Sequence, residues 1–360
     1  MHTLQQYGWN DERDMAWRKR KDGNLLPARI VADFGQAYRI ATPDRLSART
    51  AGALPHKKRA TDMPKIGDWV SAEVHSDGTA TIHEVLPRST EIVRGQAGRM
   101  LDKQVVAANV DIAFVVQPLD HDFSVERLER YVFQLAKQRI KTIILLNKAD
   151  MVDDAAEKQA LLSSLGVESI IVSAVQDESV ATIEQLIAPG QTVAIMGSSG
   201  AGKSTLTNRL LRREQQATAA IRERDSKGRH TTVHRELFLL PSGGMIIDTP
   251  GVREIQLWGN VSDLDSSFPD IAEATTQCRY RKCSHVSEDG CAIRAQLADK
   301  TIDARRYQTY LNFKRELETL QSRREFIEER RTQQTNESAK RRRRASMKSQ
   351  SDDYSYDLDS

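Results

Sequence analysis

Residues 197–204 carry glycine, lysine and serine at the spacing G-x-x-x-x-G-K-S. Glycines at these positions let backbone N–H groups wrap phosphate oxygens, while the lysine reaches the β- and γ-phosphates and the serine hydroxyl ligates Mg²⁺. The apolar run 192–196 predicts a buried strand before this phosphate loop, and residues 204–211 predict a helix after it. The sequence therefore predicts that a nucleoside triphosphate binds with Mg²⁺ at Gly197, Ser198, Ser199, Gly200, Ala201, Gly202, Lys203, Ser204 and Thr205.

A second group of residues is placed to recognise the base. Residues 147–150, here called the guanine motif, have the sequence N-K-A-D and follow the apolar run 142–146, which predicts a buried strand. A carboxylate there accepts two hydrogen bonds from the N–H groups of guanine, and adenine offers no matching pair, so Asp150 selects GTP over ATP. Alone, the tetrapeptide also fits an ordinary strand-to-helix turn, but the phosphate loop favours guanine binding. The predicted guanine contacts are Asn147, Lys148, Ala149, Asp150, Ser173 and Ala174.

A third group, residues 248–251, has the sequence D-T-P-G and follows the strand-like run 245–247. Asp248 is expected to hold Mg²⁺ through water, and the Gly251 N–H is expected to sense the γ-phosphate. In an ordinary small G protein the phosphate loop comes first and the guanine motif comes last. Here the guanine motif precedes the phosphate loop, so the sequence predicts a circularly permuted GTPase.

The segment 227–232 is the candidate for the first switch, since it lies between the phosphate loop and residue 248. Thr231 and Thr232 are its expected nucleotide contacts. Val252 stands where many GTPases carry a water-orienting glutamine, and its apolar side chain predicts slow intrinsic hydrolysis that needs a partner. His230 is the candidate catalytic residue that positions the attacking water. The alternatives are a histidine that contacts the partner, or a plain basic loop throughout.

All three cysteines of the chain lie in one cluster with a histidine, at the spacing C-x4-C-x-H-x5-C. Such soft and borderline ligands suit tetrahedral Zn²⁺, and four protein ligands leave no open position, so the site is expected to be structural. An odd cysteine count argues against a disulfide framework. The alternative is a set of unpaired thiols beside a surface histidine. The predicted zinc ligands are Cys278, Cys283, His285 and Cys291.

The composition fits a water-soluble protein. Its 360 residues are enough for two or three domains, and 39% of them are hydrophobic and 29% charged. The chain shows neither an apolar run long enough to cross a bilayer nor a secretory signal, so we expect a cytoplasmic protein. The net charge is only +3, but the basic residues gather at 18–21, 56–59 and 340–344. Each run alone fits a solvated face, whereas together they favour an RNA partner.

The predicted elements divide the chain into parts. Residues 25–100 contain about five short strands, one pair joined at Asp77-Gly78, which favours an all-β oligonucleotide-binding (OB) barrel over an SH3-like barrel. Residues 101–258 alternate strands and helices, which predicts an α/β domain with a parallel sheet. Residues 259–335 form a small zinc-binding domain with a helix over 304–331. We expect a flexible arm over 1–24 and a disordered tail over 336–360.

With the permuted order, the barrel and the cysteine cluster, residues 28–330 resemble the RsgA/YjeQ family of ribosome small subunit-dependent GTPases. The resemblance is carried by residues 228–232, residues 248–254 and the cysteine–histidine spacing. It implies an OB barrel, a permuted GTPase domain and a zinc domain. It also implies late maturation of the small (30S) ribosomal subunit, rRNA binding, GTP hydrolysis stimulated by that subunit, and a catalytic role for His230.

The sequence also bears on two other function classes. The chain is also compatible with a GTP-gated RNA-binding module that acts by occupancy, with hydrolysis incidental. A membrane-associated GTPase is disfavoured, because the sequence has no lipidation motif or amphipathic anchor. We expect a monomer.

Overall fold

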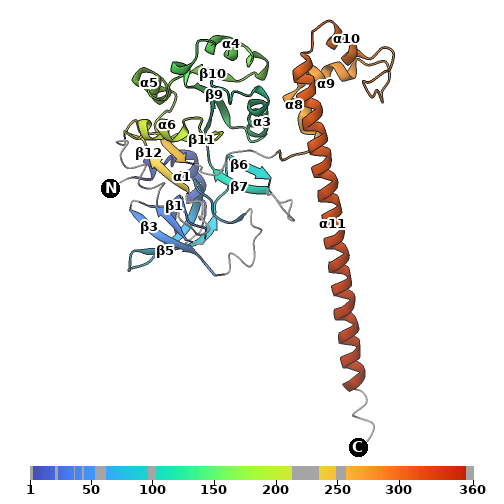
Figure 1. The fold of residues 1–360 in the computed structure, drawn as a ribbon. Coiled ribbons are helices and arrows are strands. Elements are labelled where there is room, and N and C mark those ends of the chain that lie inside the picture. Colours follow the sequence, from blue (N-terminus) through green and yellow to red (C-terminus); the bar gives the residue numbers. More distant parts are fainter. Residues whose placement is uncertain are drawn as a thin grey trace, which may run out of the picture. The chain divides into compact units, whose positions relative to one another are not determined.

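The computed structural model describes residues 3–20, 23–35, 37–42, 44–52, 62–95, 103–212, 235–248 and 257–353. These residues form two compact units, one ending at Trp258 and the other beginning at Gly259. The first unit contains a barrel and an α/β domain, and the second is helical (Figure 1). In the described part of the chain, no helix is long and apolar enough to cross a membrane.

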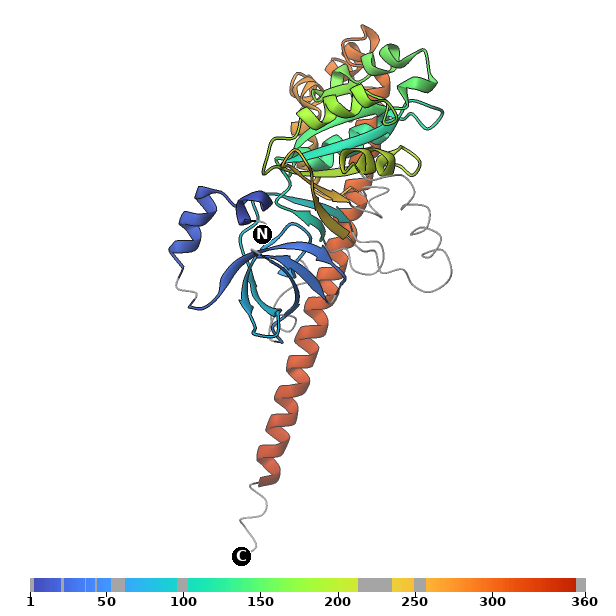
Figure 2. The same ribbon diagram turned by 90° about the vertical axis from the view of Figure 1, so that its left-hand side faces the viewer.

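The barrel is built from five strands. They are β1 (Leu26–Asp33), β2 (Tyr38–Ala41), β3 (Arg45–Thr50), β4 (Trp69–Val74) and β5 (Thr79–Val85). The order is β1-β2-β3-β5-β4, β4 pairs back onto β1, and β3 runs parallel to β5. This closure is the OB arrangement, so the expected OB barrel is confirmed over the SH3-like alternative. Figure 2 shows the strands curling into a barrel. Its buried core includes Ile30, Ile40 and Ile82.

The N-terminal segment differs from the expected flexible arm. It forms η1 (Leu4–Tyr7) and α1 (Asp11–Arg18), and Asn10 caps α1 by accepting a hydrogen bond from the Arg13 N–H. Tyr7 and Trp9 are buried, and the Trp9 ring meets the edge of Trp69, with 4.8 Å between ring centroids. The burial of these aromatic rings offsets the entropy cost of ordering a polar segment. The partner ring, Trp69, lies on a strand far away in the sequence, so the local sequence does not predict this contact.

The α/β domain has a six-stranded sheet in the order β10-β9-β8-β11-β13-β12. Its strands are β8 (Ile112–Pro118), β9 (Lys141–Asn147), β10 (Glu168–Ile171), β11 (Thr192–Gly197), β12 (Arg235–Leu239) and β13 (Met245–Asp248). All pairings are parallel except that of β12 with β13, as the alternating pattern predicts. A separate two-stranded sheet, β6 (Glu91–Gly95) with β7 (Lys103–Ala108), joins this domain to the barrel.

Helices cover both faces of this sheet. The longer helices are α3 (Val125–Ala136), α4 (Ala155–Ala160), α5 (Asp177–Gln185) and α6 (Lys203–Leu210), with short turns η3 (Ala149–Met151) and η4 (Ser163–Leu165). Leu128 of α3 belongs to the hydrophobic cluster on one face, while Ile183 of α5 and Leu206 of α6 belong to the cluster on the other. Strands buried on both faces explain the continuous apolar runs in the sequence.

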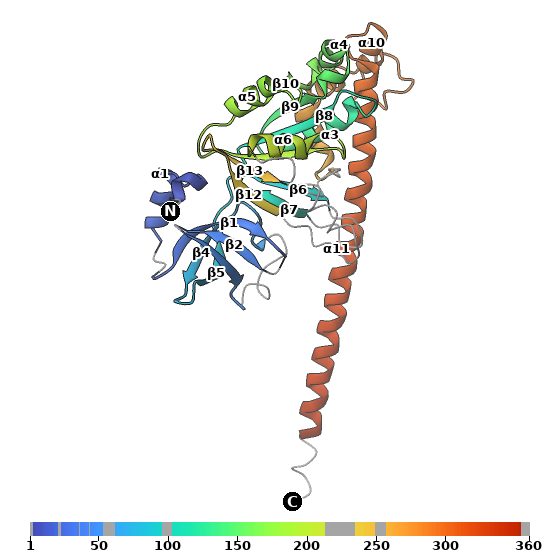
Figure 3. The same ribbon diagram turned by 60° about the vertical axis from the view of Figure 1, so that its left-hand side comes forward.

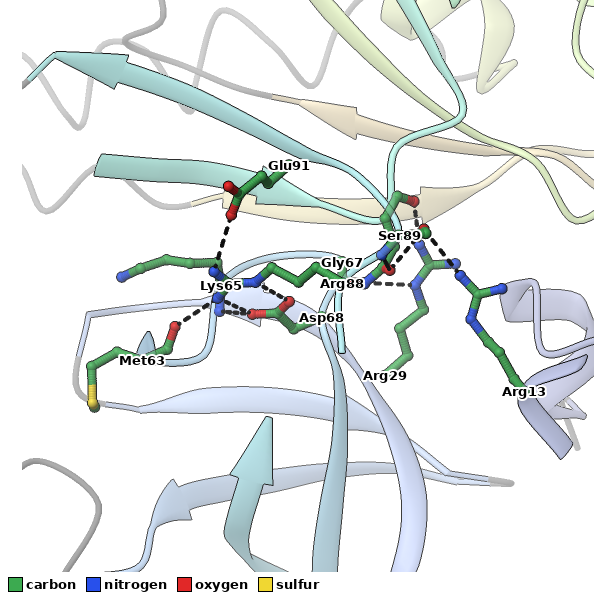
Figure 4. Close-up of polar contacts among 10 residues, drawn as sticks. Arg13, Arg29, Met63, Lys65, Gly67, Asp68, Arg88, Ser89 and Glu91 are labelled. Atoms are coloured by element: carbon green, nitrogen blue, oxygen red, sulfur yellow. Dashed lines mark hydrogen bonds and ion pairs between the residues drawn. The ribbon is translucent and has the colours of Figure 1, made fainter. Parts of the chain in front are cut away.

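One sheet runs through the barrel and the α/β domain. Strand β1 pairs antiparallel with β12, with Ala32 opposite Glu236 and Asp33 opposite Arg235, so eleven strands form a continuous sheet (Figure 3). Close by, Arg88 makes two 2.8 Å bonds to the buried carboxylate of Asp68 and donates to the Met63 carbonyl (Figure 4). The barrel is therefore joined to the α/β domain by the backbone pairing of β1 with β12, and the buried Arg88–Asp68 ion pair stabilises the barrel itself.

The second unit is a helical assembly. It comprises η5 (Val261–Asp263), α8 (Leu264–Ser267), α9 (Pro269–Thr276), α10 (Ala292–Ala298) and α11 (Ala304–Asp353). Phe313 and Leu317 of α11 are fully buried. The Nε and Nη2 atoms of Arg306 donate to the two oxygens of the Asp270 carboxylate, at 2.9 and 3.0 Å. Helix α11 continues beyond the expected end at 331, so the expected disordered tail is helical up to Asp353. The reason is compositional, since residues 304–353 contain neither glycine nor proline.

Candidate nucleotide-binding site and metal centre

The phosphate loop has the predicted context, between β11 and α6. At two of its glycines a side chain would clash with a close neighbour. A Cβ on Gly197 (φ 137°) would lie 2.1 Å from the Val116 carbonyl oxygen, and one on Gly202 (φ 95°) would lie 2.2 Å from the side-chain Nδ2 atom of Asn147. Lys203 folds over the loop and donates to the carbonyls of Gly197, at 2.9 Å, and Ser198. The ammonium group is thus held at the loop that is predicted to bind phosphates.

Asn147 connects the guanine motif to two other predicted groups. Its side chain is buried, donates to the Ala201 carbonyl at 2.7 Å and accepts from the Ala174 N–H at 2.8 Å. One amide therefore links the phosphate loop, the end of β9 and the segment after β10. The side-chain amide suits this position because it supplies a donor and an acceptor at once.

The remaining side chains of the guanine motif also have defined partners. Asp150 accepts a 2.6 Å hydrogen bond from the Ser173 hydroxyl, which orients its carboxylate. Lys148 adopts the left-handed conformation (φ 67°), and its ammonium contacts the Asp120 carboxylate at 2.7 Å. The structure therefore brings the predicted residues of 147–150, 173–174 and 197–203 together at one edge of the sheet, where parallel strands end.

A loop to which no sequence motif pointed lies beside these residues. Residues 119–124, here called the bridging loop, connect β8 to α3 and carry Asp120 and Asp122. The Asp122 carboxylate accepts a 2.7 Å hydrogen bond from the Ser198 hydroxyl and two bonds, at 2.6 and 2.8 Å, from Arg127. The Arg127 guanidinium, and then the Ser198 hydroxyl, lower the pKa of Asp122 to about 2. The available signal was its position, because these carboxylates follow a buried strand next to the phosphate-loop strand.

These groups line a cavity of about 480 Å³, whose wall includes Asp120, Asp122, Lys148, Ser199 and Gly200. Backbone from the phosphate loop, a cation from the guanine motif and carboxylates from the bridging loop meet there. A site with few convergent polar groups at the ends of sheet strands is the usual setting for a small ligand.

Several predicted residues lie outside the described part of the chain. These are His230, Thr231, Thr232, Gly251 and Val252. The backbone of Asp248 ends β13 and is paired with Ile195 of β11, next to the phosphate loop. Ser204 and Thr205 occupy the first turn of α6. The catalytic assignment of His230 and the Mg²⁺ ligands Ser204 and Asp248 therefore stay predictions.

The cysteine–histidine cluster is brought together as predicted. The ligand atoms of Cys278, Cys283, His285 and Cys291 all lie within 4.8 Å of one another. The Nδ1 atom of His285 is 3.5 Å from the sulfur of Cys278 and 3.5 Å from that of Cys291. Zinc–ligand bonds of about 2.3 Å to sulfur and 2.0 Å to nitrogen give a tetrahedral sulfur–nitrogen edge of about 3.5 Å. The donor set and its spacing therefore fit a tetrahedral metal ion.

The loop that presents His285 is organised by Glu288. The Glu288 carboxylate accepts hydrogen bonds from the N–H groups of Ser284, at 2.7 Å, and of Val286 and Ser287, each at 3.2 Å. Hydrogen bonding, first of all from Ser284, lowers the pKa of Glu288 to about 2. His285 itself has φ 61°, a left-handed conformation that this loop must maintain.

Comparison with known proteins adds independent findings. A family model described as RsgA GTPase matches residues 85–258, and a model for ABC transporters matches residues 180–354, a range with the phosphate loop but not the guanine motif. The small ribosomal subunit biogenesis GTPase RsgA of Opitutus terrae is 38% identical over 328 residues, covering 87% of this chain and 89% of the relative. The protein of the same name from Xanthomonas campestris is also 38% identical, covering 88% and 89%.

Solved structures show the same fold. YloQ, a circularly permuted GTPase, has a TM-score of 0.59 at 24% identity and covers 83% of this chain and 97% of its own. YjeQ from Thermotoga maritima has a TM-score of 0.61 at 22% identity and covers 81% and 98%. At this identity the structural likeness concerns the fold alone.

Proposed function

This chain belongs to the RsgA family of circularly permuted GTPases, and we propose that it acts in late maturation of the small (30S) ribosomal subunit. In this proposal it binds rRNA, hydrolyses GTP to GDP and phosphate when the subunit stimulates it, and is released by that hydrolysis. The names of the relatives that are 38% identical support the ribosomal part. The single observation that supports the nucleotide part best is Asn147, which joins the guanine motif to the phosphate loop.

In the proposed complex each predicted residue has a defined task. Asp150 pairs with guanine, and the backbone of Ser173 and Ala174 contacts the guanine oxygen. Lys203 reaches the β- and γ-phosphates, and Ser204 ligates Mg²⁺, with Asp248 holding the ion through water. His230 positions the attacking water, since Val252 occupies the position of the usual glutamine. The expected first-switch contacts are Thr231 and Thr232, and Gly251 senses the γ-phosphate.

The sheet supports a route by which hydrolysis changes RNA binding. Strand β12 follows the predicted first-switch segment and pairs with β1 of the barrel, while β13 leads into the predicted second switch. A change at the γ-phosphate would therefore act on β12, which is paired with a strand of the barrel. Because of the permutation, the second switch also precedes the metal-binding unit in the chain. We propose that the barrel and this unit hold rRNA in the GTP state, in a cytoplasmic, monomeric protein.

The metal that we propose for the Cys278, Cys283, His285 and Cys291 set is one structural Zn²⁺. Thiolates and imidazole are the ligands that zinc prefers, and bound metal would hold a loop that has little apolar core of its own. No catalytic step is assigned to this ion.

Co-sedimentation with purified small subunits tests the proposal. We expect the protein to sediment with them in GTP or a non-hydrolysable GTP analogue and to leave after hydrolysis, with His230→Ala remaining bound in GTP. Sedimentation that is equal in GTP, analogue and GDP would contradict nucleotide control. Full subunit-stimulated turnover by His230→Ala would show that the catalytic assignment is wrong.

The second candidate is a GTP-gated RNA-binding module that acts by occupancy. The continuous sheet from barrel to switch strand also fits this function, because it couples nucleotide to the barrel without hydrolysis. The same experiment separates the two functions. If the protein leaves the subunit as fast with the non-hydrolysable analogue as with GTP, release needs only nucleotide dissociation. That result favours the occupancy function.

A further inference from the structure

The bridging loop holds both nucleotide motifs with two carboxylates that are two residues apart. Asp120 contacts the Lys148 ammonium of the guanine motif, and Asp122 contacts the Ser198 hydroxyl of the phosphate loop. We infer that Asp122 is a positioning residue for GTP, which acts through Ser198 by holding the phosphate loop in its binding conformation. This inference rests on the proposed placement of GTP on that loop.

The bridging loop is itself rigidly supported. The Asp122 carbonyl accepts a 2.8 Å hydrogen bond from the buried Gln117 side chain, and the Asp122 N–H donates to Asp120 at 3.0 Å. Arg127 lies in the first turn of α3, where its N–H donates to the capping hydroxyl of Ser124. Helix α3 packs into the core, so Asp122 is held from both sides before it contacts the phosphate loop.

The geometry at Asp122 is that of a shared carboxylate. One oxygen, Oδ2, accepts both the Ser198 hydroxyl at 2.7 Å and an Arg127 nitrogen at 2.6 Å, while Oδ1 accepts the second Arg127 nitrogen at 2.8 Å. Hydrogen bonds to a charged acceptor are about twice as strong as neutral ones. The Arg127 guanidinium therefore fixes the acceptor, and the acceptor fixes Ser198.

The phosphate loop needs support that does not depend on Lys203. Lys203 contacts the Gly197 and Ser198 carbonyls, but this is the side chain that must contact phosphates when GTP binds. Asn147 holds the loop at Ala201 and Asp122 holds it at Ser198. Both contacts are compatible with bound nucleotide, since neither uses a backbone N–H of the loop. If either contact is lost, the ligand must order the loop when it binds. Part of the binding free energy then offsets the entropy of ordering the loop, so the affinity falls.

The test compares Ser198→Ala, Asp122→Ala and the double variant in GTP turnover and fluorescent GDP binding. Each single change should raise the KM for GTP and the Kd for GDP about tenfold with kcat unchanged, because ground state and transition state lose the same support. The double variant should be no weaker than Asp122→Ala, since both changes break one contact. Asp77→Ala is the matched control and should leave both constants unchanged, because Asp77 accepts its 2.7 Å bond from the Thr79 hydroxyl in the barrel.

Two outcomes overturn the inference. An unchanged KM in Ser198→Ala would mean that Asp122 serves only to stabilise α3, even if Asp122→Ala unfolds at lower temperature. Additive effects in the double variant would mean that the two residues act separately. Lys203→Ala tests the nucleotide site separately. If Lys203→Ala binds GTP normally, the proposed placement of the nucleotide is wrong. If Lys203→Ala loses GTP binding while Ser198→Ala binds normally, only the inference about Asp122 is refuted.

Discussion

Arg29 on the barrel strand β1 donates a 2.8 Å hydrogen bond to the hydroxyl of Thr192, the first residue of the strand that ends in the phosphate loop. The guanidinium is buried, stacks over the Trp69 ring and also donates to the carbonyls of Tyr7, Gly67 and Asn109 (Figure 4 shows Arg29 beside Gly67). Burial, and then the nearby Arg13 charge, lower its pKa to about 9. One side chain thus joins the N-terminal segment, the barrel and the α/β domain.

Replacing Arg29 should therefore destabilise the first unit as a whole. Arg29→Met leaves several buried acceptors without a donor and should lower the free energy of unfolding by about 3 kcal/mol. Thr192→Val removes one hydroxyl and should cost about 1 kcal/mol. Urea unfolding measures both. Arg18→Met is the control, because that side chain is 78% exposed and should change little. Equal stability of Arg29→Met and Arg18→Met would contradict the role of Arg29.

A change at Asp150 should alter base selectivity. The Asp150→Asn side chain keeps one acceptor oxygen and gains an N–H donor. It therefore loses the hydrogen bond to the guanine amino group. It can instead donate to a base that carries a carbonyl in place of that amino group. We expect GTP affinity to fall roughly a hundredfold and that of the xanthine nucleotide to rise. Competition binding with GTP, xanthosine triphosphate and ATP measures this. Ser173→Ala, which removes only the hydroxyl bonded to Asp150, should weaken GTP without changing base preference. Retained GTP preference in Asp150→Asn would refute the assignment.

Metal removal should affect the second unit and spare the first. Cys283→Ser, or treatment with a strong chelator, should release one zinc per chain and lower the melting temperature of the helical unit, because the loop has little other core. GTP binding to the isolated protein should stay normal, since the proposed nucleotide residues belong to the first unit. Metal content by elemental analysis and calorimetry measure these effects. Ser287→Ala, in the same loop, should retain the metal. A protein without stoichiometric metal would contradict the proposed centre.

Acid should remove the stability that Asp122 contributes. Its pKa is about 2 in the folded protein against 3.8 for an unperturbed aspartate, so its contribution is present above pH 3.8 and is lost as the pH falls toward 2. The difference in melting temperature between the wild type and Asp122→Asn should be largest above this window and shrink within it. A difference that is independent of pH from 5 to 2 would show that the carboxylate charge is not what stabilises the loop.

The sequence predicted the site where residue type and strand position coincide. Asn147 and Lys203 follow apolar runs, and parallel strands bring such positions to one edge, so their proximity follows from the pattern. The cysteine–histidine spacing was equally informative, because its ligands are local. The contacts of Asp122 with Ser198 and of Arg29 with Thr192 were not predicted, since each joins residues far apart in the chain and neither has a periodic signal. Trp9 was missed for the same reason, because its partner Trp69 lies on a distant strand.

The most direct test of the central claim is GTP turnover by the purified protein, alone and with small subunits, large subunits or free rRNA. Lys203→Ala serves as the control for contaminating activity. The account predicts slow turnover alone, strong stimulation by small subunits only, and none in Lys203→Ala. Turnover that no ribosomal component stimulates, or that large subunits stimulate equally, would contradict the claim that this GTPase is controlled by the small subunit.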